Sequence, residues 1–141
     1  TPSGGPVGTA MLGLYAENLE SVSCFHRLTG DEVWHFYGGD PALLYLLHPD
    51  GSSQEIIMGP DFAAGQYQQF RIPAGVWQAG CLAPGGRYAL FGCTMAPVFT
   101  GGCFEAGMAD ELVKAWPDQA DIIRRLAVNG DHRRMPEGFA N

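Results

Sequence analysis

Short apolar runs with alternating polar positions follow one another along most of the chain, and Gly, Pro, Asp and Asn separate them. Turn-forming groups such as Pro49-Asp50-Gly51 and Pro84-Gly85-Gly86 occupy the separations. A period of two residues is typical of strands with one buried face, and repeated short strands favour an all-β sandwich or barrel. The predicted strands cover residues 9–16, 21–27, 32–37, 42–48, 53–58, 66–72, 76–83 and 88–98.

The pattern changes after residue 107. Apolar side chains over residues 108–116 and 119–127 follow helical spacing, and Pro117-Asp118 between them fits a helix end followed by an N-cap. We therefore expect two short helices on the outside of the β-structure. Residues 129–141 are rich in Gly, Arg and Pro, and we expect a loose terminus there.

Length and composition indicate one acidic domain. The 141 residues suit a single domain with its own core. Only 8 Lys and Arg stand against 15 Asp and Glu, a net charge of −7, which argues against nucleic acid or an anionic membrane as partner. No apolar run reaches the ~18 residues of a membrane span.

The cysteines do not form a metal or redox motif. Cys24, Cys81, Cys93 and Cys103 contain no CxxC pair, and three of them lie in apolar runs where Cys acts as a small hydrophobic residue. We therefore expect reduced thiols and a cytoplasmic location.

Candidate chemistry lies in two neighbouring predicted strands. His26 shares a face with Cys24 and Leu28, and in the next strand Glu32, Trp34 and Phe36 share one face while His35 and Tyr37 share the other. A carboxylate and two imidazoles on adjacent strands suit acid–base chemistry or metal binding. The alternative is a buried structural histidine, with Glu32 paired with Arg27 or bonded to a backbone group.

The segment from Arg71 to Ala79 contains a second candidate group. Pro73 and Gly75 predict a turn with positive φ at the glycine, after which Val76, Gln78 and Gly80 share one face. A glutamine on a buried face needs a hydrogen-bond partner, which is either a backbone group or part of a site.

These segments resemble the two motifs of the cupin superfamily. The run from His26 through Leu28 to Glu32, followed by Gly39, resembles HxHxxxxE with its glycine, and Pro73-Ala74-Gly75-Val76-Trp77-Gln78 resembles PxGxxH. Together with Asp31-Glu32-Val33-Trp34-His35-Phe36-Tyr37 and Gly92-Cys93-Thr94-Met95-Ala96-Pro97, they resemble the Cupin_5 family (DUF985) over about residues 7–115.

The resemblance implies an RmlC-like jelly roll, a double-stranded β-helix, with a ligand pocket inside the barrel and a homodimeric assembly. Residues 1–141 would form one such domain, with the barrel over about 7–105, a helical tail over about 106–128 and the loose terminus over 129–141. Cupins include enzymes of several classes and plain binding proteins, so the fold alone implies no single reaction.

Departures from the motifs bear on the cofactor. His26 and Glu32 match two metal ligands of the first motif, whereas Leu28 and Gln78 stand where the other two histidines would be. His26, Glu32 and Gln78 would then bind a divalent metal weakly, and His35 has the wrong strand parity to replace a lost ligand unless a bulge intervenes. We expect that no cofactor is required.

Metal-free cupins of the sugar-epimerase type use a barrel histidine as base and a tyrosine as acid. The resemblance therefore implies His26 as base, Glu32 as its partner and Tyr37 as acid, with Tyr45, Tyr67 and Tyr88 as other candidate acids. The expected ligand contacts are Trp34, His35, Phe36, Trp77 and Gln78.

The function favoured by this interpretation is an isomerase, epimerase or lyase that moves a proton on a small polar organic molecule. The alternatives are a metal-dependent, oxygenase-like cupin and a non-catalytic small-molecule binding module.

Overall fold

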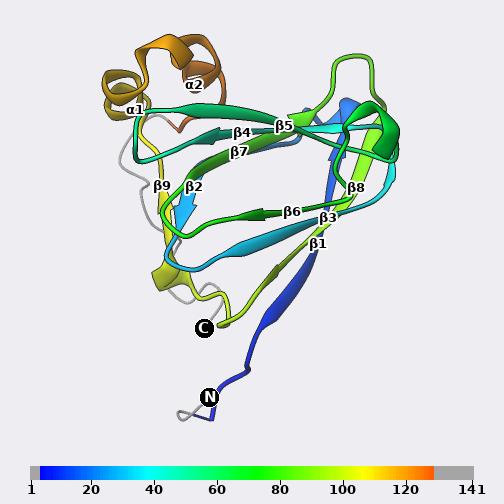
Figure 1. Ribbon diagram of the computed structural model, residues 1–141, viewed down its shortest axis with the longest axis horizontal. Coiled ribbons are helices and arrows are strands. Elements are labelled where there is room, and N and C mark those ends of the chain that lie inside the picture. Colours follow the sequence, from blue (N-terminus) through cyan, green and yellow to red (C-terminus); the bar gives the residue numbers. More distant parts are fainter. Residues whose placement is uncertain (1–3, 129–141) are drawn as a thin grey trace.

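Two antiparallel sheets pack face to face in a jelly roll (Figure 1), and the computed structural model describes residues 4–128 of the chain. The four-stranded sheet has the order β1-β8-β3-β6, and the five-stranded sheet has the order β5-β4-β7-β2-β9. The strands are β1 (Thr9–Ala16), β2 (Val22–Leu28), β3 (Glu32–Gly39), β4 (Ala42–Leu47), β5 (Ser53–Met58), β6 (Gln69–Ile72), β7 (Trp77–Leu82), β8 (Tyr88–Met95) and β9 (Phe104–Ala106).

The predicted strands are present, with changes at their ends. The predicted strand over 66–72 shortens to β6 because its first residues follow a short 3-10 turn that ends at Gly65, where φ is +82°. The predicted strand over 88–98 ends at Met95, just before Ala96-Pro97, where the proline has no N–H for strand pairing. Sequence patterning missed β9, since three residues are too few to show a period.

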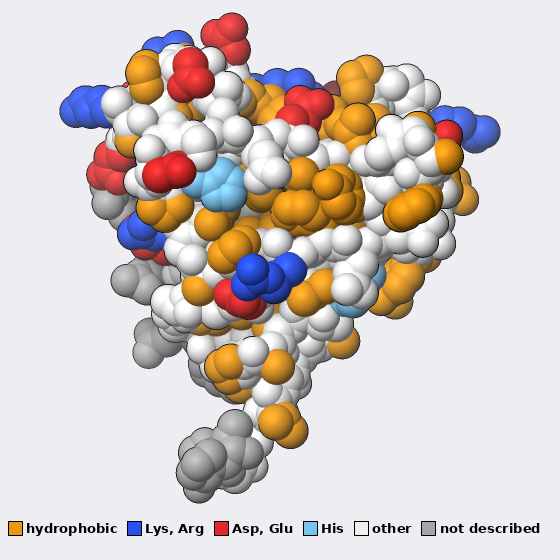
Figure 2. Space-filling model, in the orientation of Figure 1, with side chains coloured by type: hydrophobic (Ala, Val, Ile, Leu, Met, Phe, Trp, Pro, Cys, Tyr) orange, Lys and Arg blue, Asp and Glu red, His pale blue; other side chains and the backbone are white. Residues whose placement is uncertain are grey.

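The space between the sheets is filled by apolar side chains from both of them. In β4, Leu44 and Leu46 point into this space and meet Trp34 and Phe91 from the opposite sheet. We call this group the inner cluster. Phe36, Phe70 and Leu82 lie partly exposed at its margin, and Figure 2 shows apolar side chains gathered between β6 and β7.

The other face of the five-stranded sheet is covered by the two predicted helices, α1 (Ala109–Ala115) and α2 (Ala120–Leu126), at the upper left of Figure 1. Phe25, Trp77, Ile123 and Leu126 are buried where the helices meet the sheet. We call this group the outer cluster. Both faces of β4 are therefore buried, which explains its nearly continuous apolar run.

The outer face of the four-stranded sheet has no such cover among the described residues. Leu12, Leu14, Tyr37 and Leu90 are exposed there, with Leu12 at 74%. No helix within residues 4–128 is long and apolar enough to cross a membrane. All four cysteines are free thiols, and the expected loose terminus over 129–141 lies outside the described residues.

Candidate functional site

A bulge in β2 determines which side chains enter the barrel. Ser23 pairs with Gly80 and His26 pairs with Gln78, so three steps along β2 match two steps along β7. Directly paired residues share a face. Ser23 and His26 therefore both face the interior, while Phe25 between them turns to the outer cluster.

His26 is held in one orientation by its own strand. Its Nδ1–H donates a hydrogen bond of 2.7 Å to the carbonyl oxygen of Cys24, which leaves Nε2 as the acceptor of a neutral imidazole. The ring stacks on Phe104 of β9, with 5.3 Å between centroids. Removal from water lowers the pKa of His26, and the hydrogen bond to Cys24 opposes this only in part. His26 therefore has the protonation state of a general base near neutral pH.

Gln78 connects the two sheets across the barrel. Its side chain is 1% exposed, and Oε1 accepts a hydrogen bond of 2.9 Å from the indole Nε1–H of Trp34. The amide also contacts the carboxyl group of Glu32. His26 lies opposite Gln78 on the neighbouring strand, so Gln78 borders both of the predicted catalytic side chains.

Glu32 is a buried carboxylic acid inside this apolar space. It is 8% exposed, and its Oε2 has no hydrogen-bond partner. Burial raises the pKa of Glu32, and the neighbouring polar groups of Gln78, Trp34 and Cys93 reverse only part of that rise. The neutral form is thereby favoured over the carboxylate.

Tyr15 is an interior residue that the sequence analysis missed. Its hydroxyl lies 2.6 Å from Ser23 Oγ and occupies the space that a Cβ on Gly80 would need. The side chain is 3% exposed, and burial raises its pKa. Gly80 and Gln78 are two residues apart on β7, so this hydroxyl lies about 7 Å along the strand from the Gln78 row. The signal in the sequence was the glycine inside an apolar strand, which marks the close approach of another group.

Two predicted site residues of β3 lie on the opposite side of their sheet. His35 Nε2 hydrogen-bonds Thr94 Oγ1 at 2.9 Å, and its ring stacks on Tyr37 with 6.2 Å between centroids. Tyr37 is 55% exposed and its ring lies over Gly92. The bulge in β3 falls after Phe36, too late to turn His35 inward.

The remaining predicted contacts divide between the two clusters. Trp34 and Phe36 belong to the inner cluster. Trp77 lies in the outer cluster, where the guanidinium of Arg27 sits 4.6 Å from its ring centroid. Of the other candidate acids, Tyr45 packs against the outer cluster, and Tyr67 and Tyr88 are exposed. The structure thus brings together His26, Glu32, Trp34, Phe36 and Gln78, with Tyr15 in addition; we call these the inner site.

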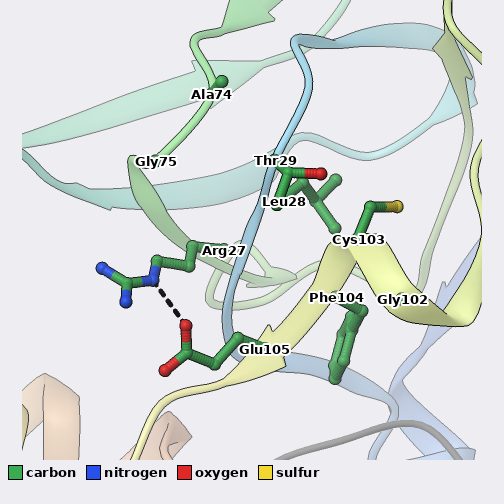
Figure 3. Close-up of a pocket in the computed structure, with 9 residues that line it drawn as sticks. All are labelled: Arg27, Leu28, Thr29, Ala74, Gly75, Gly102, Cys103, Phe104 and Glu105. Atoms are coloured by element: carbon green, nitrogen blue, oxygen red, sulfur yellow. Dashed lines mark hydrogen bonds and ion pairs between the residues drawn. The ribbon is translucent and has the colours of Figure 1, made fainter.

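A cavity of about 470 Å³ lies between β2, β9 and the turn at Ala74 and Gly75 (Figure 3), and its lining contains no residue of the inner site. Arg27 and Glu105, which line it, form an ion pair with 2.8 Å between Nε and Oε2. Phe104 also lines the cavity and stacks on His26. This aromatic ring therefore connects the open cavity with the candidate base.

The donor set of the inner site does not fit a metal centre. Oε1 of Gln78 already accepts the indole N–H of Trp34, which leaves His26 and Glu32 as the matching ligands. Within residues 4–128 no group of three or more His, Cys, Asp or Glu side chains is placed to hold a metal ion. We therefore derive no step through a metal.

Comparison with known proteins agrees with the fold. The chain belongs to the Cupin_5 family of the cupin superfamily (DUF985), whose family model matches residues 4–107. Its architecture is the RmlC-like jelly roll that the motifs predicted. No curated protein matches the chain.

Solved structures with the same fold come from several organisms. A protein from Shewanella oneidensis is 30% identical, with a TM-score of 0.79 over 88% of this chain and 77% of that one. A hypothetical protein from Leishmania major is 24% identical, with a TM-score of 0.79 over 87% and 77%. A dTDP sugar isomerase from Desulfovibrio desulfuricans is 19% identical, with a TM-score of 0.59 over 74% and 67%, and is similar in fold alone.

Proposed function

We propose that the inner site binds a small polar organic molecule and moves a proton on it, in an isomerase, epimerase or lyase reaction. The observation that carries this proposal is the position of His26. It faces the barrel interior opposite Gln78, with Nδ1–H held by the Cys24 carbonyl and Nε2 left as an acceptor. A neutral imidazole fixed in this way is a suitable base for a proton next to a carbonyl group.

The proposed step begins with transfer of that proton from the ligand carbon to Nε2 of His26. The electron pair moves onto the ligand carbonyl oxygen and gives an enolate, which hydrogen-bond donors in a water-poor site stabilise. Gln78 and Glu32 border this position. Return of a proton to the other face of the same carbon gives an epimer, and return to a neighbouring carbon gives an isomer.

Tyr15 is the tyrosine best placed to return the proton. It faces the interior and keeps its phenolic proton because burial raises its pKa. Its hydroxyl is about two strand residues away from the row of His26 and Gln78, a distance that a molecule of sugar size spans. Tyr37, which the motifs suggested, faces outward over Gly92.

Deuterium exchange tests the proposal. The protein is incubated in D₂O with a panel of keto sugars, lactones and hydroxy ketones, and NMR follows deuterium entry at carbon. We expect exchange with a subset of the panel, and a loss of about 10²–10⁴-fold in rate for His26→Gln. His48→Gln is the matched control, because His48 lies outside the barrel and bonds Gln54.

A comparison of two tyrosines identifies the acid. Tyr15→Phe should lower the exchange rate, whereas Tyr37→Phe should leave it unchanged. Full activity of His26→Gln would refute the assignment of the base. Activity that depends on Tyr37 would show that the catalytic acid lies on the outer face of β3.

A non-catalytic binding module is the second candidate. It is favoured by the Trp34–Gln78 hydrogen bond, which joins the two sheets and holds both side chains in fixed positions. Tight binding of a panel compound without exchange in D₂O would select this function.

The assembly and location are further parts of the proposal. Exposed Leu12, Leu14 and Leu90 on the four-stranded sheet support a homodimer, because an uncovered apolar sheet face favours association. Light scattering measures the mass directly. The four free thiols support a reducing compartment such as the cytoplasm.

A further inference from the structure

Glu32 Oε2 is a buried polar atom that the fold leaves without a partner. Within the described residues it is the buried side-chain oxygen or nitrogen that makes no hydrogen bond. The residue as a whole is 8% exposed. Leaving such a group unpaired costs free energy, because its bonds to water are lost and not replaced. Because the neighbouring side chains leave this oxygen without a hydrogen bond, a bound ligand group is its natural partner.

The surroundings of Glu32 determine what kind of group fits. Within its own sheet, Glu32 pairs with Ile72 of β6 and Met95 of β8. The next pair that faces the interior, two residues along the strands, is Trp34 and Cys93. Gln78 reaches it from the opposite sheet. The titratable groups that face it are the thiol of Cys93 and the phenol of Tyr15, and burial raises the pKa of both, so both stay uncharged. His26 lies beyond Gln78, and burial lowers its pKa, which favours the neutral imidazole.

The cationic side chains lie elsewhere. Arg27 is on the outer face of β2, held by Trp77 and Glu105, and Arg71 is exposed beside Asp31. A phosphate or carboxylate at Glu32 would have to leave water and approach a carboxyl group with neutral neighbours, which is costly. An uncharged oxygen group meets no such penalty and completes the hydrogen bonding of Oε2.

We infer that Glu32 Oε2 is the anchor for a carbonyl or hydroxyl oxygen of the ligand, so that the barrel selects uncharged hydroxy-carbonyl compounds over phosphorylated or nucleotide-linked ones. The inference rests on the proposed function only for the location of the site. An uncharged ligand would differ from the nucleotide-linked sugar that gives the dTDP sugar isomerase of the same fold its name.

The indole N–H of Trp34 is a direct reporter for this site, because it bonds Gln78 next to Glu32. A fragment set is assembled in matched groups: free sugars and ketones, their phosphate esters, the corresponding carboxylates, and the corresponding amines. Each compound is titrated while NMR follows the Trp34 indole signal. The signal is assigned with Trp34→Phe.

We expect neutral fragments to shift the Trp34 signal and to bind at least about 10-fold more tightly than their phosphate or carboxylate partners. Glu32→Leu should weaken the neutral fragments about 5–20-fold, as loss of one hydrogen bond does. Glu32→Gln, which keeps a hydrogen-bonding group, should stay within about 3-fold of wild type. Glu55→Gln is the matched control on the exposed side of β5.

Other outcomes overturn the inference. If a phosphate, carboxylate or amine compound bound more tightly than its neutral counterpart, the site would prefer a charged ligand. Unchanged affinity of neutral fragments for both Glu32 variants, or no neutral fragment that moves the Trp34 signal, would show that Oε2 does not anchor the ligand. Neutral binding without deuterium exchange supports the inference and refutes the proposed reaction, whereas exchange on a phosphorylated compound does the reverse.

Discussion

The inner and outer clusters are equally buried, yet they contain different chemistry. The outer cluster joins Phe25, Trp77, Ile123 and Leu126 with apolar contacts, and two helices cover it. Against the inner cluster lie a glutamine that is 1% exposed and a carboxylic acid that is 8% exposed. Stability alone is better served by the outer arrangement, since buried polar groups need partners. The difference supports the proposal that the interior serves a ligand, whereas the outer cluster stabilises the domain.

Truncation in the outer cluster should give the largest loss of stability. Ile123 is fully buried against the sheet, so Ile123→Ala should lower the free energy of unfolding by about 2–5 kcal/mol. Urea denaturation measures this. The Trp34 indole signal of the folded variant should stay where it is in wild type; a displaced signal would mean that the clusters are not independent.

Removal of the inner glutamine should have a smaller effect on stability. Gln78→Leu leaves the Trp34 indole N–H without its acceptor, and we expect a loss of about 1–3 kcal/mol. Ligand binding should fall in the same variant. The control is the partly buried indole of Trp116, which donates to the Ser52 carbonyl and should be unaffected. A variant as stable as wild type would show that the apolar replacement compensates for the lost bond.

The pH dependence of stability should come from the inner site, because its buried carboxylic acid titrates there. Burial raises the pKa of Glu32 above its ordinary 4.5, so the folded protein holds this proton more tightly than the unfolded chain. This contribution is fully present below the unfolded pKa and is lost as pH rises through the folded pKa. Relative to Glu32→Gln, wild type should therefore lose stability from pH 4.5 upward, by at most about 1.4 kcal/mol per pH unit. Parallel curves of unfolding free energy against pH for the two proteins would contradict this.

The smallest effect is expected on the outer face of the four-stranded sheet. His35→Gln removes a partly exposed hydrogen bond to Thr94, so the free energy of unfolding should change by about 0.5 kcal/mol or less. Deuterium exchange on ligands should keep its rate. A loss of exchange comparable with that of His26→Gln would place the outer face in the reaction.

Much of the fold could be predicted because its cause is local. The alternation along residues 9–16 and 53–58 predicted β1 and β5 with their observed ends. The apolar spacing after residue 107 predicted both helices. Strand β9 could not be predicted in this way. Its three residues form a strand only because β2 lies beside them.

The candidate site was predictable in composition and less so in geometry. The motif resemblance selected His26, Glu32 and Gln78, and the structure places all three around the inner site. Alternation correctly separated His35 from Glu32, although both were considered for the site. Tyr15 was missed because nothing in its own strand distinguishes it; its partner Ser23 and the space above Gly80 come from other strands.

The bulge between Ser23 and His26 has a consequence for how such a barrel changes over time. With one residue fewer between Ser23 and His26, two steps along β2 would match two steps along β7, and both residues would keep their partners Gly80 and Gln78. The imidazole would therefore stay inside the barrel. The bulge is thus a place where the gene can lose one codon without changing which side chain of β2 faces the ligand.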